Sequence, residues 1–252
     1  MSTHRMGKIN QLIMEWPKGT VRLASSLSGL GYSKDLLKKY VYSNWLESLG
    51  YGAFKLAGDP TGWEGSLFAL QSQENSTIHA GGKTVFQLKG YAHYLSQKPT
   101  TIFLFGSPQD YLPKWFKNQE WYDNINYSAT SSFDYSSKMY FSEQEMGNFN
   151  VRISSLELAA LEMLYLVPQE QSFDEALQLV EGLTTLRPKL LQSLLEKCNS
   201  VKVNRLFLYM AEKNNHTWFK DLNIKRINLG SGKRVIVEGG TFDKKYNITV
   251  TK

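Results

Sequence analysis

One short segment near the N-terminus has the side chains needed to hold a polyanion. Ser33 is a good N-cap for a helix that runs to about Asn44. At 100° per residue, one side of this helix is apolar, formed by Leu36, Leu37, Tyr40 and Val41. The opposite arc carries Asp35 and the five residues of interest, Ser33, Lys34, Lys38, Lys39 and Tyr42. The lysines can neutralise phosphates, and the hydroxyls can reach base edges or the backbone of DNA in a major groove. For an isolated helix, a solvated polar face is the simpler interpretation.

The elements around this helix favour the DNA-binding interpretation. A first helix has an apolar face formed by Ile9, Leu12, Ile13 and Trp16, and Pro17 and Gly19 end it. Thr20 is expected to cap a second helix, whose inward residues are Val21, Ala24 and Leu27. After the third helix, residues 45–49 and 53–56 flank the turn Gly50-Tyr51-Gly52, which predicts a β-hairpin. Three short helices followed by a hairpin is the order of a winged helix-turn-helix. In such a fold the hairpin tip, Tyr51, lies beside the DNA backbone, with Lys55 close to it.

Positive charge is concentrated in this part of the chain. Residues 1–58 contain eight Lys or Arg against three acidic residues, a net charge of +5, whereas the whole chain carries +6. Long-range attraction to a polyanion is therefore localised in the first quarter of the protein. The residues that we predict to bind DNA are Arg22, Ser33, Lys34, Lys38, Lys39, Tyr42, Tyr51 and Lys55.

A chain of 252 residues is long enough for two domains with their own cores. The turn-rich sequence Asp59-Pro60-Thr61-Gly62 predicts a boundary between residues 1–58 and residues 59–252. Beyond it, helices are expected at 63–73 and 83–95, strands at 76–80 and 100–105, and a hairpin from 139–143 with 149–153. Capping boxes begin helices at Ser154 with Glu157 and at Ser172 with Glu175, Pro188 opens another, and a further helix spans 201–212. Strands at 233–238 and 246–251, connected in part by Gly239-Gly240, close the chain. The fold class is thus mixed α+β, an N-terminal winged helix followed by a larger α/β domain.

Several motifs that suggest an enzyme or a bound cofactor are incomplete. Gly82-Lys83-Thr84 resembles the end of a phosphate-binding loop, but Thr77 stands where that motif needs glycine, so a tight helix start is expected instead. Four histidines and one cysteine show no zinc-ligand spacing, although His79 and His93 flank one helix and can meet a carboxylate in the fold. Cys198 falls on the apolar side of a helix and is interpreted as a core thiol. No Gly-x-Ser-x-Gly elbow is present. We therefore expect no catalytic residues, no metal and no cofactor.

The location and a second surface can also be predicted. Neither a secretory signal nor an apolar run of about 18 residues is found, so a cytoplasmic protein without a membrane span is expected. Four cations of the larger domain are candidates for a basic surface that meets an acidic partner or a nucleic acid: Lys202, Arg205, Lys233 and Arg234. The alternative is that they are ordinary exposed charges or pair with Glu212 and Glu238.

The sequence resembles the AbiEi family of antitoxins from bacterial type IV toxin–antitoxin and abortive-infection systems. The similarity lies in residues 31–54, 62–71, 79–94, 182–188, 201–208 and 229–234, and is weakest at about 107–150. This resemblance implies a winged helix that binds inverted repeats in promoter DNA and represses its own operon. It also implies a C-terminal domain that counteracts a toxin with a nucleotidyltransferase-like fold, without a stable complex between them being required.

Two alternatives stay open at this point. The chain is an ordinary winged-helix repressor whose C-terminal domain senses a ligand or a protein, or that domain enzymatically modifies the toxin or its substrate. Oligomeric state is open as well. Without a heptad repeat, a monomer or a weak dimer that binds DNA cooperatively fits the sequence.

Overall fold

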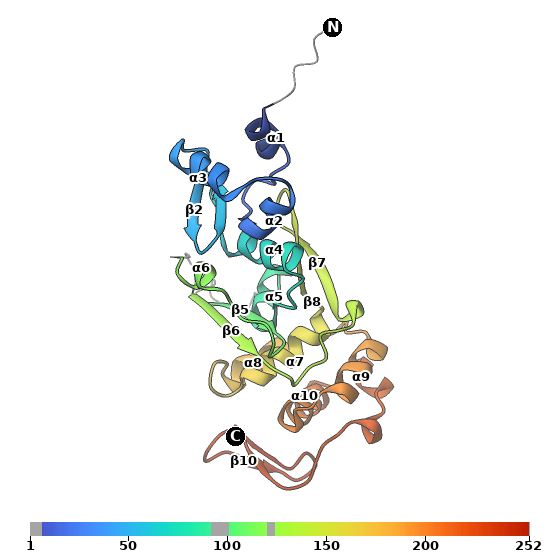
Figure 1. The fold of residues 1–252 in the computed structure, drawn as a ribbon. Coiled ribbons are helices and arrows are strands. Elements are labelled where there is room, and N and C mark those ends of the chain that lie inside the picture. Colours follow the sequence, from blue (N-terminus) through green and yellow to red (C-terminus); the bar gives the residue numbers. More distant parts are fainter. Residues whose placement is uncertain (1–6, 92–100, 120–123, 252) are drawn as a thin grey trace. The chain divides into compact units, whose positions relative to one another are not determined.

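The computed structural model describes residues 7–91, 101–119 and 124–251 (Figure 1). Helices and three small sheets are mixed along the chain, which confirms the α+β class. Two compact units are formed. Unit 1 comprises Met1–Ile78, Asp110–Tyr122 and Glu143–Arg152, and unit 2 comprises His79–Gln109, Asp123–Ser142 and Ile153–Lys252. Unit 1 thus contains more than the first 58 residues, and the domain boundary between residues 58 and 59 stays a prediction.

Unit 1 has the element order of a winged helix. The order is α1 (Lys8–Met14), β1 (Arg22–Leu23), α2 (Ala24–Gly29), α3 (Lys34–Tyr42), β2 (Leu46–Gly50) and β3 (Ala53–Leu56). The three strands form an antiparallel sheet in the order β1-β3-β2. A small apolar core joins the three helices to the hairpin, formed by Leu12, Trp16, Leu27, Tyr32, Leu37 and Leu46. The predicted inward faces of the first and third helices are therefore confirmed.

The start of the second helix was predicted wrongly. Thr20 does not cap it, because the Thr20 hydroxyl donates to the Pro17 carbonyl at 2.6 Å. The next residues form β1, which pairs Arg22 with Phe54 and Leu23 with Ala53, and α2 begins only at Ala24. A two-residue strand has no periodicity of its own, and its partner lies thirty residues further along the chain. At α3, by contrast, Ser33 is the N-cap as predicted, and the helix ends at Tyr42, two residues earlier than expected.

Helix α4 (Trp63–Gln73) has the predicted bounds and belongs to unit 1. The Val21 backbone N–H donates to the Gly65 carbonyl at 3.2 Å. The side-chain amide of Gln73 accepts from the Leu23 N–H and donates to the Val21 carbonyl, both at 2.9 Å. These bonds satisfy backbone groups of Val21 and Leu23 along the edge of β1 that does not pair with β3. Gly65 is required where the helix meets the chain before β1, because a β-carbon there would overlap the Gly19 carbonyl.

The main sheet has the strand order β6-β5-β4-β8-β7. Its strands are β4 (His79–Ala80), β5 (Thr101–Gly106), β6 (Asn124–Ala129), β7 (Phe141–Glu145) and β8 (Asn150–Ser154). Strand β5 runs antiparallel to β4 and parallel to β6, beside which it lies in Figure 1. Helix α5 (Gly82–Leu88) packs on β5. Residues 92–95 of the helix expected at 83–95, and His93, lie outside the described residues, as does Thr100 of the strand expected at 100–105.

The helical part of unit 2 follows local capping chemistry. It consists of α7 (Leu156–Leu166), α8 (Phe173–Glu181), α9 (Pro188–Lys197) and α10 (Val201–Lys213). Ser172 accepts from the Glu175 N–H as the cap of α8, and Pro188 opens α9, as predicted. The cap of α7 was predicted one residue too early, because Ser155 accepts from Leu158 while the Ser154 hydroxyl bonds to Glu162.

Short elements complete unit 2. They are the 3₁₀ turns η2 (Lys138–Tyr140), η3 (Thr217–Asp221) and η4 (Ile224–Arg226), and the strands β9 (Arg234–Val235), β10 (Thr241–Asp243) and β11 (Ile248–Val250). The last three form a sheet in the order β10-β11-β9. Both closing strands, β9 and β11, are shorter than predicted. The sequence analysis missed β10, which lies between them in the chain and runs antiparallel to β11, so β9 and β11 pair in parallel.

Candidate DNA-binding surface

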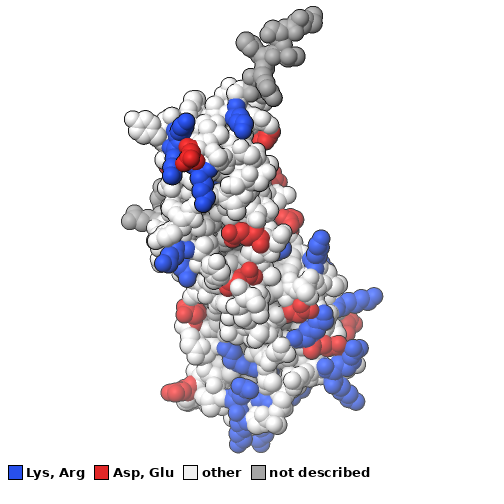
Figure 2. Space-filling view, viewed as in Figure 1, with Lys and Arg blue, Asp and Glu red and all other residues white. Residues whose placement is uncertain are grey.

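The third helix of the winged helix exposes the predicted cations. We call Ser33, Lys34, Lys38, Lys39 and Tyr42 the α3 arc. The arc is outward because the opposite side of α3 packs into the core, where Leu37 is buried. All five residues of the arc are exposed. Figure 2 shows the basic side chains gathered over α3, with an acidic group between them.

Few protein groups compete for these lysines. Lys34 and Lys39 form no ion pair with another residue that the structure describes. Lys38 lies 3.7 Å from Asp35, but both side chains are more than four-fifths exposed. Such an exposed pair contributes at most about 1 kcal/mol and is screened by salt. A phosphate can therefore replace Asp35 as the partner of Lys38 at little cost.

Exposed aromatic rings extend the α3 arc towards the wing. Tyr42 is 92% exposed, Tyr51 is 69% exposed, and Trp45 is also exposed. Trp45 was not among the predicted site residues. Its position three residues after Tyr42 is the signal that could have identified it.

The wing is held by a helix that comes from much later in the chain. Tyr51 at the tip has φ = +50°, between Gly50 and Gly52, which also have positive φ. Helix α6 (Lys114–Lys117) packs beside β2, and the Gln119 side chain donates to the Leu49 carbonyl at 3.1 Å. The Lys114 ammonium lies 5.7 Å from the centroid of the Tyr51 ring.

Helix α6 adds cations that sequence reasoning missed. Lys114 and Lys117 are exposed, whereas Trp115 and Phe116 between them are buried. The buried pair anchors the helix, so the two lysines lie on a fixed element of unit 1. About sixty residues separate them from the wing, and no local pattern indicates that they meet it.

Two predicted DNA contacts have partners inside the winged helix. The Arg22 guanidinium donates to the Glu15 carbonyl at 2.8 Å and lies 5.7 Å from the Trp16 ring. Lys55 lies 3.0 Å from Glu47 and donates to the Asp59 carbonyl at 3.1 Å. The Gly58 N–H and Lys55 lower the pKa of Glu47, which keeps that partner ionised. These two cations are thus less free than those of the α3 arc, and their contact with DNA stays a prediction.

The second predicted basic surface is not assembled as expected. Arg205 is only 1% exposed, which corrects its assignment to a surface. Its guanidinium donates to the carbonyls of Leu229, Gly232 and Asn247 at 2.6, 2.7 and 3.1 Å. It therefore fastens the C-terminal segment to α10.

The other three members of that set differ in their surroundings. The Lys202 ammonium donates to the Tyr165 and Val167 carbonyls, both at 2.6 Å, and burial, aided by Arg234, lowers its pKa. Lys233 and Arg234 are exposed, with the Lys233 ammonium 4.9 Å from the Phe242 ring centroid. Glu212 pairs with Lys245, not with any of the four. Only Lys233 and Arg234 are thus presented to a partner.

The start of α5 holds a protein carboxylate where a phosphate loop would hold phosphate. Glu162 accepts from the Gly82 N–H at 3.1 Å and from the Ser154 hydroxyl at 2.7 Å, and its other oxygen lies 2.8 Å from His79 Nε2. Lys83 pairs with Glu175. The interpretation of this segment as a helix start is confirmed, and so is the meeting of His79 with a carboxylate.

Other reactive groups are buried or dispersed. Burial raises the pKa of Cys198 to about 11, so its thiol is protonated at neutral pH. Within residues 7–91, 101–119 and 124–251, no group of three or more His, Cys, Asp or Glu side chains is arranged to hold a metal ion. In the same ranges no helix is long and apolar enough to cross a membrane.

Comparisons with known proteins match both parts of the chain. Residues 5–97 match the family model described as "Transcriptional regulator, AbiEi antitoxin N-terminal domain". Residues 99–251 match the model described as "Transcriptional regulator, AbiEi antitoxin, Type IV TA system". No curated protein matches the sequence. Among solved structures, the chain is similar to the RV2827C protein from Mycobacterium tuberculosis, with a TM-score of 0.62, 12% identity, and coverage of 95% of this chain and 88% of that one. At this identity the likeness shows a shared fold.

Proposed function

The chain belongs to the AbiEi antitoxin family, the transcriptional regulators of type IV toxin–antitoxin systems, and from this premise we propose how it acts. Its winged helix binds double-stranded promoter DNA at inverted repeats and represses its own operon in the cytoplasm. The remainder of the chain counteracts a toxin with a nucleotidyltransferase-like fold, through contacts that need not form a stable complex.

The observation that carries the DNA-binding half is the α3 arc. Three exposed lysines and a nearly fully exposed tyrosine lie on the helix that enters the major groove in winged-helix proteins. The lysines neutralise phosphates at the groove edges, which supplies affinity, while Ser33 and Tyr42 face the bases. The wing, with Tyr51, and α6, with Lys114 and Lys117, contact the backbone beside the groove.

Gel-shift titration of the full-length protein on its own promoter tests this half. Lys38→Ala with Lys39→Ala should weaken binding about tenfold, since two phosphate contacts are lost. A promoter reporter in the same strain should lose repression in parallel. Lys18→Ala is the matched control, because Lys18 is an exposed lysine in the turn before β1 and outside the α3 arc. Unchanged affinity of the double variant would remove α3 from the interface.

The antitoxin half is supported by the family and needs its own test. Deleting residues 1–58 is a poor way to separate the two activities, because α4 would lose its bonds to Val21 and Leu23. The full-length Lys38→Ala, Lys39→Ala variant is a cleaner tool. Co-expressed with the toxin from a heterologous promoter, it should protect cells as well as the wild type does. Loss of protection would mean that DNA binding itself neutralises the toxin.

Inverted repeats require two copies of the recognition helix. We propose that two chains fill them, either as monomers that bind cooperatively or as a weak dimer. Sedimentation velocity of the free protein and of its promoter complex distinguishes the two: a monomer when free, with two chains per promoter, supports cooperative binding.

A further inference from the structure

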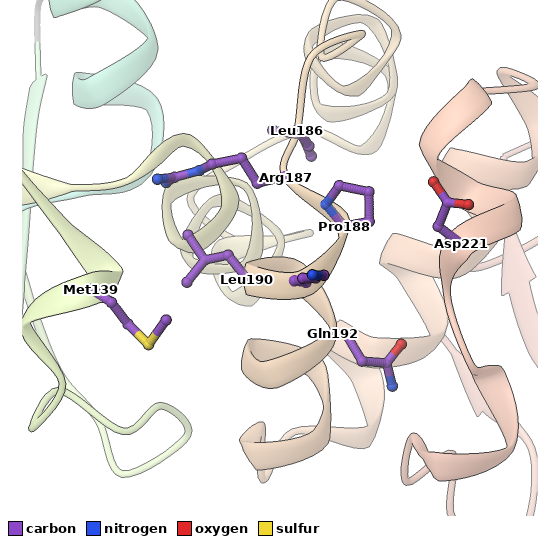
Figure 3. Close-up of a pocket in the computed structure, with 8 residues that line it drawn as sticks. Met139, Leu186, Arg187, Pro188, Leu190, Gln192 and Asp221 are labelled. Atoms are coloured by element: carbon purple, nitrogen blue, oxygen red, sulfur yellow. The ribbon is translucent and has the colours of Figure 1, made fainter.

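Unit 2 has an open groove along α9, with a volume of about 980 Å³ (Figure 3). Apolar side chains form much of its lining: Met139, Leu186, Pro188 and Leu190. Of its charged residues, Arg187 pairs with Glu157, and Lys189 and Asp221 have opposite signs. The charges that line the groove therefore select neither an acidic nor a basic partner.

The wing of unit 1, by contrast, contains a β-bulge that points to a function. The register of β2 against β3 shifts between Ser48 and Gly50, so Leu49 has no partner residue in β3. A bulge places one extra residue outside the ladder, increases the local twist and changes the direction of nearby side chains. Because Tyr51 at the tip follows two residues later, the bulge sets the direction in which this ring leaves the sheet.

Two side chains satisfy the backbone groups at this bulge. The Gly50 N–H donates to the Ser48 hydroxyl at 3.2 Å. The Leu49 carbonyl accepts from the Gln119 side-chain amide, which also donates to the Trp115 carbonyl, both at 3.1 Å. Gln119 thus joins the end of α6 to the wing at the residue that the ladder leaves out.

The segment that carries α6 is itself fixed within unit 1. Before the helix, Asp110 accepts from the Thr77 N–H at 3.0 Å and from the Ser76 hydroxyl at 3.1 Å. Within the helix, Trp115 and Phe116 are buried. A side chain on such a fixed element can hold a neighbouring loop in one position.

The other side of the wing tip is bonded to α2. The Ala24 N–H donates to the Gly52 carbonyl at 2.7 Å. Tyr51 has φ = +50°, a conformation that is unfavourable for a residue with a bulky side chain. Such a conformation persists where the surrounding contacts enforce it, and it is typical of functional sites. The bonds from Ala24 and Gln119 supply these contacts on the two sides of the tip.

We propose that Gln119 is a positioning residue for DNA binding, an inference that rests on the proposed function of the winged helix. By holding the bulge, Gln119 fixes the wing before DNA arrives. Tyr51, which is 69% exposed, then faces the DNA backbone, with the Lys114 ammonium 5.7 Å from its ring centroid. A wing that is already ordered loses less conformational entropy on binding, which increases affinity. The part of the chain that binds DNA thus extends beyond the first 58 residues and includes α6.

Gln119→Met tests this role in the full-length protein. Methionine is similar in length and uncharged, but it cannot donate to the Leu49 carbonyl. Affinity for the promoter duplex should fall about fivefold, as expected when one hydrogen bond that orders the wing is lost. The salt dependence of binding should stay that of the wild type, because no lysine–phosphate contact is removed. Gln11→Met is the matched control, because Gln11 is an exposed glutamine of α1 that bonds to Glu15, and it should keep wild-type affinity.

A double-mutant cycle with Tyr51→Ala separates positioning of the wing from other effects. If Gln119 acts through the wing tip, Gln119→Met should weaken binding less than about twofold when residue 51 is already alanine. Hydrogen exchange of the free protein should show faster exchange in residues 46–56 and unchanged exchange in α1 and α3. An undiminished loss of affinity in the Tyr51→Ala background, or loss of protection throughout unit 1, would overturn the proposal.

The outcomes also separate this proposal from the proposed function. If Lys38→Ala with Lys39→Ala binds the promoter weakly while Gln119→Met binds like the wild type, the α3 arc binds DNA and the positioning role fails. A reduced salt dependence in Gln119→Met would likewise contradict positioning, since it would mean that a phosphate contact had been lost. If the wild-type chain does not bind its promoter, the proposed DNA-binding function fails first.

Discussion

Replacement of Glu162 by leucine should destabilise unit 2 strongly. The Glu162 and His79 side chains are fully buried, and the carboxylate is bonded to His79, to the Gly82 N–H and to the Ser154 hydroxyl. Leucine fills a similar volume but leaves three buried polar groups without this acceptor. An unsatisfied buried polar group costs about 1–3 kcal/mol, and three groups lose the Glu162 acceptor. We expect a total loss of about 3–5 kcal/mol for Glu162→Leu.

Glu162→Gln provides an internal comparison. Glutamine keeps one oxygen for Gly82 and Ser154, and its amide group can donate to His79 Nε2 if the imidazole carries its proton on Nδ1. A smaller loss of about 1–2 kcal/mol is expected. Glu181→Gln, an exposed carboxylate on α8, should change stability by less than about 0.5 kcal/mol.

Hydrogen exchange read by mass spectrometry is the suitable assay, because a chain of two units need not unfold in one step. Peptides from α5 and α7 should lose protection by about 100-fold or more in Glu162→Leu, since 1.4 kcal/mol corresponds to a factor of ten. Protection within about threefold of the wild type, roughly 0.6 kcal/mol, would refute the view that this cluster holds α5 on α7.

Three further perturbations follow from the structure. Arg205→Met should lower protection of residues 228–250 by about 2–4 kcal/mol in the same exchange assay, because three hydrogen bonds to carbonyls are lost, and unchanged protection would contradict that role. Hydrogen bonds from Ser136 hold the pKa of Asp134 at about 2, so its stabilisation is present above the unfolded pKa of about 3.9 and is lost as pH falls towards 2. Asp134→Asn should thus cost about 1 kcal/mol at pH 7, allowing for solvent exposure, and the difference in urea unfolding should vanish near pH 2. Gly65→Ala should lower the melting temperature and the promoter affinity together, since its methyl group would overlap the Gly19 carbonyl; wild-type values of both would show that α4 can shift freely.

Local chemistry explains what could be predicted from the sequence. The third helix was found because Ser33 caps it and its apolar residues repeat at helical spacing, and the hairpin because glycines flank its turn. Helix α4 and the start of α9 at Pro188 follow from the same kind of signal. Each of these features is decided by residues within about four positions of one another.

Long-range pairing explains what could not be predicted. Strand β4 has only two residues, and Ala80 pairs with Leu104 on one side and Ile153 on the other. Arg205 lies on the border of an amphipathic helix, and the carbonyls that bury it arrive from residues 229–247. A helical projection contains no information about segments that pack from elsewhere.

The candidate DNA-binding site also has a part that local sequence predicts and a part that only long-range contacts create. The α3 arc is a property of one helix, so its residues were identified together. The contribution of α6 depends on Gln119 and Lys114 meeting the wing, which only the folded chain brings about. Arg22 was predicted from its charge and Lys55 from its place near the wing tip, and their internal partners become visible only in the fold.

The salt dependence of promoter binding tests the central claim most directly. Each lysine–phosphate contact contributes about 0.9 to the slope of log affinity against log salt. Lys34→Ala with Lys38→Ala and Lys39→Ala should therefore reduce the slope by about 2.7, measured by fluorescence anisotropy with the full-length protein and its promoter duplex. A control with Lys18→Ala and Lys244→Ala, both exposed and outside the α3 arc, should keep the wild-type slope. An unchanged slope for the α3 variant, or an equal reduction in the control, would contradict recognition of DNA by this helix.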